Sequence, residues 1–102
     1  MGKNRTIKIL GNIIGNLVVH KILVKYTNKS ESINHLKSEV EAYRDNSLEI
    51  ASEYNWNEKD KAKIKSLSFK NFEKDMSNYY TDVKFPMEEV HKLIEETISE
   101  IL

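Results

Sequence analysis

Three histidines and a few neighbouring acids are the residues of this chain best suited to catalysis or metal binding. Glu88-Glu89-Val90-His91 has the Glu-x-x-His spacing that supplies two ligands to metal centres inside helical bundles. A metal-binding bundle is therefore one interpretation. The inward face of this segment, however, is centred on Val90, Ile94 and Ile98, which leaves Glu88 outside it and His91 at its edge. A carboxylate that points into water is a poor ligand, so the sequence predicts no metal site.

The other two histidines do not form a recognisable catalytic group. His20 lies among apolar residues, and His35 lies between Glu31 and Glu39, a setting in which histidines often have no catalytic role. The chain has no HExxH motif, phosphate-binding glycine loop, nucleophile elbow or dinucleotide fingerprint, and it has no cysteine. We therefore predict no catalytic residue and no cofactor, and a protein that is not an enzyme.

Lysines offer a second kind of chemistry, the binding of phosphate groups. One face of the expected third helix carries Lys59, Lys63, Lys70 and Lys74, and the N-terminal segment adds Lys3, Arg5 and Lys8. Such a stripe can neutralise phosphates, so nonspecific nucleic-acid binding is the alternative function. The formal net charge of the whole chain is zero, with 16 basic and 16 acidic residues. This balance, and the presence of only two arginines, favour a simple solvated face over a base-reading surface.

Two glycines indicate a close helix crossing. Gly11 and Gly15 stand four residues apart and allow another backbone to approach, either from a second copy of the chain or from a helix of the same chain. On the expected third helix, Ile64 and Leu67 lie roughly opposite the predicted buried face and form a second, exposed patch. The candidate protein-contact residues are therefore Gly11, Gly15, Val19, Ile22, Ile64 and Leu67.

Hydrophobic periodicity predicts four helices, at about residues 4–26, 31–54, 58–80 and 86–101. Residues 27–30 read as a turn, Asn57 and Asp60 have the spacing of a capping box, and Pro86 suits a first helical position. In the third segment the expected buried residues are Ala62, Phe69, Phe72, Met76, Tyr79 and Tyr80. In the fourth they are Val90, Leu93, Ile94, Thr97, Ile98 and Ile101. The second segment shows a short heptad pattern in which Glu39 and Arg44 would pair across a parallel dimer.

The first segment is apolar, but its apolar stripe changes sides between Val18 and Lys21. A helix with this pattern either touches two neighbours along its length or breaks. Its β-branched residues and Gly-Asn pairs also permit strands, so an α+β fold with an N-terminal hairpin is the alternative. Lys8, Asn12, Asn16 and further polar residues interrupt the apolar run, which argues against a membrane span.

These observations predict a single domain over residues 1–102, folded as an all-α, four-helix, up-and-down bundle. The four segments carry alternating net charge, positive in the first and third, which favours sequence neighbours as packing partners and disfavours the first helix beside the third. The absence of cysteine fits a cytoplasmic protein. We expect it to act through protein contacts, as a homodimer or with an unidentified protein partner.

Overall fold

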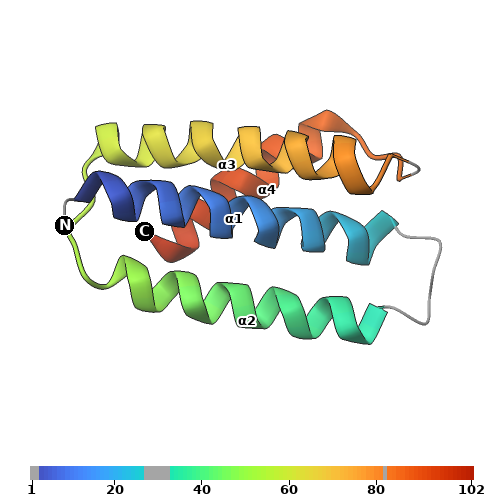
Figure 1. The fold of residues 1–102 in the computed structure, drawn as a ribbon, viewed down its shortest axis with the longest axis horizontal. Coiled ribbons are helices and arrows are strands. Elements are labelled where there is room, and N and C mark those ends of the chain that lie inside the picture. Colours follow the sequence, from blue (N-terminus) through green and yellow to red (C-terminus); the bar gives the residue numbers. More distant parts are fainter. Residues whose placement is uncertain (1–2, 27–32, 82) are drawn as a thin grey trace.

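Four helices make up the fold. The structure, a computed structural model, describes residues 3–26, 33–81 and 83–102, and these residues contain no strand. The helices are α1 (Lys3–Tyr26), α2 (Ile33–Ala51), α3 (Glu58–Tyr79) and α4 (Met87–Ile101), as Figure 1 shows. The predicted all-α fold is confirmed. The alternative with an N-terminal hairpin is wrong, because residues 3–26 form one continuous helix.

The helix ends lie close to the predicted positions. Before α3, the backbone N–H of Asp60 donates to Asn57 Oδ1 at 2.8 Å and that of Asn57 donates to Asp60 Oδ2 at 3.3 Å, which is the predicted capping box. Pro86 is the cap of α4 rather than its first helical residue, with ψ of 133°. α2 ends at Ala51, three residues before the expected end. The predicted turn at 27–30 and the first two residues predicted for the second helix, 31 and 32, lie outside the described residues.

α1 is the central helix of the bundle. It contacts the other three helices, most extensively α3 and then α2, and these two lie on opposite sides of it (Figure 1). This position follows from its composition, since a helix that is apolar on most of its surface must be buried on most of its surface. The change of stripe near Val18 is therefore explained by different neighbours along one unbroken helix. The buried residues of α1 are Ile7, Leu10, Gly11, Ile14, Gly15, Leu17, Val18, Val19, Ile22 and Leu23.

α1 and α3 lie side by side and run in the same direction. Contacts between them join Lys3 to Asp60 near the start of both helices and Asn16 to Asn71 further along. The charge pattern disfavoured this arrangement, so that prediction is wrong. The physical reason is one of magnitude, because exposed charge pairs contribute only about 0–1 kcal/mol each, whereas close packing of a buried surface contributes more.

The remaining helices run antiparallel to α1. His20 of α1 contacts Glu39 of α2, and Lys3 at the start of α1 contacts Asn55, which follows the end of α2. On α4, Thr97 accepts a hydrogen bond from Lys21, and Glu89 pairs with Lys25 near the end of α1. These contacts fit the alternating directions of an up-and-down bundle. In Figure 1, α4 crosses behind α1, from the α3 side at its beginning toward the α2 side at its end.

α3 contributes two sides to the core, because it packs against both α1 and α4. Ile64 has an exposed fraction of 0%, so its predicted exposure is wrong, and Phe72 and Met76 are buried as predicted. Ala62 and Tyr79 were expected to be buried but are exposed, Tyr79 at 74%. In α4, Leu93 is half-buried, and the other five residues of the predicted inward face are buried.

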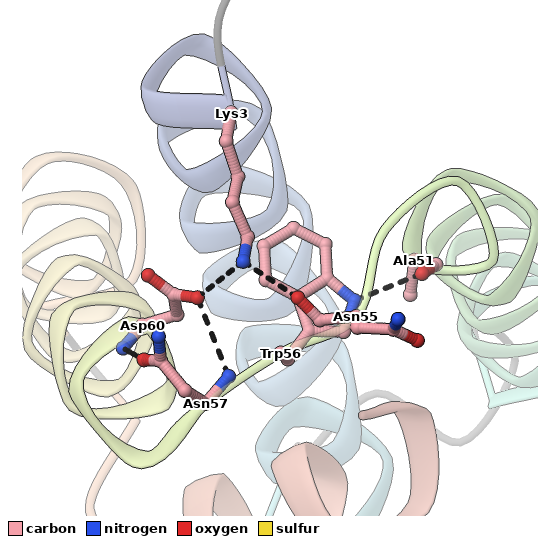
Figure 2. A network of polar contacts seen from close by, with 6 residues as sticks. All are labelled: Lys3, Ala51, Asn55, Trp56, Asn57 and Asp60. Atoms are coloured by element: carbon pink, nitrogen blue, oxygen red, sulfur yellow. Dashed lines mark hydrogen bonds and ion pairs between the residues drawn. The ribbon is translucent and has the colours of Figure 1, made fainter.

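A polar network fixes the beginning of α1 to the connection between α2 and α3 (Figure 2). Lys3 Nζ donates to the carbonyl oxygen of Asn55 at 2.6 Å, pairs with Asp60 at 2.6 Å and lies over the ring of Trp56. The Trp56 ring nitrogen donates to the Ala51 carbonyl oxygen. This network aligns the starts of α1 and α3, which sets the register of the two helices.

Candidate nucleic-acid interface

The contact between α1 and α3 is closest at the two glycines. A Cβ atom at Gly11 would lie 2.6 Å from Leu67 Cβ, and one at Gly15 would lie 2.8 Å from Asn71 Cβ and 2.9 Å from the carbonyl oxygen of Ser68. No other residue type fits there without movement of the helices. The sequence therefore predicted a close crossing correctly, and the structure shows that its partner is α3 of the same chain.

The predicted protein-contact residues are consequently inside the fold. Val19, Ile22 and Ile64 are at most 1% exposed, Gly11 and Gly15 are covered by α3, and Leu67 is half-buried. Five of the six residues are therefore covered by this chain's own helices, and only Leu67 keeps part of its side chain at the surface. The predicted exposure is wrong for Ile64, because α3 packs against two helices and a second side of it is buried, whereas Leu67 remains partly exposed in a surface groove.

The same packing gathers lysines on the outer surface of α1 and α3. We call this surface the basic face and define it as Lys8, Lys59, Lys63, Lys70 and Lys74, all of which are exposed. The four lysines of α3 share one side of that helix by their spacing, and they span about 22 Å at a rise of about 1.5 Å per residue. Lys8 joins them because it lines the same surface groove as Lys63.

That groove runs between α1 and α3 and has a volume of about 450 Å³. Ile7 and Leu67 give it an apolar floor, and Asn4, Lys8, Lys63 and Ser66 surround that floor with polar groups. Farther along the same pair of helices, the side-chain amide of Asn71 donates to the Asn12 carbonyl oxygen at 3.1 Å and to Asn16 Oδ1 at 3.2 Å. The outer surface along the glycine contact therefore combines polar and basic groups with the apolar floor of the groove.

The lysines on the two sides of α3 differ in whether they form ion pairs. Lys61 and Lys65, on the side toward α4, pair with Glu58 and Glu95 respectively. Within residues 3–26, 33–81 and 83–102, the five lysines of the basic face form no ion pair. α1 also contains no acid, so its side of the face brings no carboxylate near Lys63.

The engaged lysines also lower the pKa values of the acids that they contact. The hydrogen bond from Lys3 is the main cause of a lowered pKa at Asp60, to which Asn57 and the more distant Lys63 add. The hydrogen bond from Lys65 lowers the pKa of Glu95. Lys63 thus acts on Asp60 only at a distance, and its ammonium group stays available at the surface.

The histidines lie away from the basic face, and two of them share the carboxylate of Glu39. His20 Nε2 and His35 Nε2 each lie 2.7 Å from an oxygen of Glu39, while Arg44 pairs with Glu100, so Glu39 and Arg44 both have partners within the chain. His91 stacks on Phe69 with ring centroids 4.8 Å apart. In the part of the chain that the structure describes, no group of three or more histidines or acids is arranged to hold a metal ion.

Comparison with known proteins does not place the chain in a family. No family model matches the chain, and no curated protein or solved structure is significantly similar to it. α1 is long and apolar enough, by length and composition alone, to cross a membrane, a criterion that core helices of soluble proteins also meet. More than half of its apolar stretch is buried against the other helices.

Proposed function

We propose that the protein binds the phosphate backbone of nucleic acids, without sequence preference, through the basic face. The observation that carries the proposal is the parallel packing of α1 on α3, which adds Lys8 to four α3 lysines on a surface where the described residues form no ion pair. Lysine ammonium groups act as point charges on phosphates, and such contacts fix position without reading bases.

The expected strength follows from the number of lysines. Five phosphate contacts correspond to a slope of about −4.5 in log K against log salt concentration for duplex DNA. Affinity is then in the usual nonspecific range, with a Kd of about 10⁻⁴ to 10⁻⁶ M at physiological salt, and it rises steeply as salt is lowered. The zero net charge is spread over all four helices, and screening limits the effect of acids that lie more than about 8–10 Å from these lysines.

The test is fluorescence anisotropy of a labelled 20-base-pair duplex, titrated at several salt concentrations. Replacing both Lys63 and Lys70 with glutamine should make the salt slope about 1.8 units shallower. The matched control replaces Lys61 and Lys65, which removes the same charge from the other side of α3 and should change the slope little. Equal loss in both double variants, or no binding of the original protein at low salt, would refute the proposal.

Self-association is a second candidate, supported by two exposed apolar side chains that differ from the predicted contact residues. Tyr79 is 74% exposed and Met87 is 44% exposed, at the end of α3 and the start of α4. Tyrosine and methionine are among the residue types enriched at protein interfaces. Light scattering after size exclusion at physiological salt gives the absolute mass, and a dimer that becomes monomeric when Tyr79 and Met87 are replaced by lysine would support this candidate. A monomer at all concentrations would remove it.

A further inference from the structure

A second groove opens on a different side of the molecule, between α2 and α4. The two helices contact each other less than any other touching pair in the fold. Arg44 of α2 pairs with Glu100 near the end of α4, whereas the start of α4 lies toward α3 (Figure 1). The residues of α2 and α4 that line the groove come before this ion pair along both helices, and α1 contributes the rest of the lining.

The lining of this groove combines aliphatic surface with two ammonium groups. Its volume is about 420 Å³, which lies within the range of small-molecule sites. Val24, Val40 and Leu93 provide the aliphatic part, one residue from each of α1, α2 and α4. The charged lining residues are Lys21, Lys37 and Glu41, so the lining has a net charge of +1.

Lys21 is the unusual member of this set. Its side chain is half-buried, and its Nζ donates to Thr97 Oγ1 at 3.1 Å, a hydroxyl whose residue is only 1% exposed. One turn later on α1, Lys25 pairs with the carboxylate of Glu89. Among the described residues Lys21 has no such carboxylate within ion-pair distance. A neutral hydroxyl does not compensate a partly desolvated ammonium group as an anion does.

We propose that the groove between α1, α2 and α4 binds a medium-chain alkyl carboxylate, with the carboxylate at Lys21 and Lys37 and the chain on Val24, Val40 and Leu93. A single net positive charge and the nearby Glu41 favour a monoanion over a dianion such as phosphate. The aliphatic lining, without an aromatic side chain, favours an alkyl chain over a flat ring. This site is independent of the basic face.

The test is a titration of the ¹⁵N-labelled protein with decanoate, followed by NMR. We expect saturable shifts at Val24, Val40 and Leu93. Decanol, which has the same chain without the charge, should bind about tenfold more weakly, since a charge-assisted hydrogen bond is lost. This comparison uses the unaltered protein, so it does not depend on the folding of a variant.

A pair of matched variants tests the position of the carboxylate. Lys21→Met keeps an unbranched apolar side chain as far as Cε but removes the ammonium group, and it should weaken decanoate binding about tenfold while leaving decanol binding unchanged. Lys92→Met removes the same charge from an exposed position of α4 outside the groove and should change neither. Equal binding of decanoate and decanol, an unchanged affinity in Lys21→Met, or the absence of saturable shifts at the groove would each overturn the proposal.

Discussion

Replacing Gly15 with alanine should destabilise the protein, although alanine is the better helix former. An added Cβ would lie 2.8 Å from Asn71 Cβ and 2.9 Å from the backbone carbonyl oxygen of Ser68, about 0.5 Å closer than the 3.4 Å at which ordinary contact begins. Neither atom can move alone, because the oxygen belongs to the backbone of α3 and Cβ is bonded directly to it. The substitution must therefore push α1 and α3 apart.

The magnitude is a balance of two effects. Alanine in place of glycine within a helix gains about 0.5–1 kcal/mol in helix propensity. Forcing an extra methyl group into a tightly packed contact costs about 1–3 kcal/mol. Since α1 and α3 form the most extensive helix contact of the fold, we expect the upper part of that range and a net loss of about 1–2 kcal/mol. A loss of that size lowers the Tm of a domain of this length by about 5–10 °C.

Urea denaturation followed by circular dichroism measures this change directly. The control is Asn46→Ala, at an exposed position within α2, where the gain in propensity acts alone and should stabilise the protein by about 0.5 kcal/mol. If Gly15→Ala proved as stable as the original protein or more stable, the close approach of α1 and α3 would be wrong.

Two further predictions concern the core and the dependence of stability on pH. Ile64→Ala should lower the free energy of unfolding by about 2–5 kcal/mol, because Ile64 is fully buried, whereas Ile9→Ala, at a residue 39% exposed, should cost less than about 1 kcal/mol. Similar losses in both variants, measured by urea denaturation, would contradict the position of Ile64. The pKa values of Asp60, Glu89 and Glu95 are lowered, mainly by hydrogen bonds from Lys3, Lys25 and Lys65 respectively. In acid, the folded state therefore binds fewer protons than the unfolded state. The contribution of these acids to stability should be complete above about pH 5 and should disappear as the pH falls through the lowered pKa values, and a free energy of unfolding that stays constant between pH 5 and pH 3 would contradict these ion pairs.

Local signals in the sequence determined the elements of this fold. The capping box at Asn57 and Asp60 gave the start of α3, because it depends only on residues three apart. The inward face of α4 followed from the regular spacing of Val90, Ile94 and Ile98. The glycine pair predicted a close crossing, since the absence of a Cβ is a property of the sequence itself.

Only the tertiary structure decided which surfaces meet. Periodicity shows which residues share a side of a helix, but not which neighbour covers that side, so the partner of Gly11 and Gly15 stayed open. On α3 the side toward α1 includes buried Ser68 and half-buried Asn71, whose polarity concealed that this side is covered. The small exposed-charge effects that disfavoured α1 beside α3 were outweighed by packing at the glycines. That contact also brings Lys8 beside Lys63, and the candidate interface therefore depends on a neighbour relation that the sequence alone does not contain.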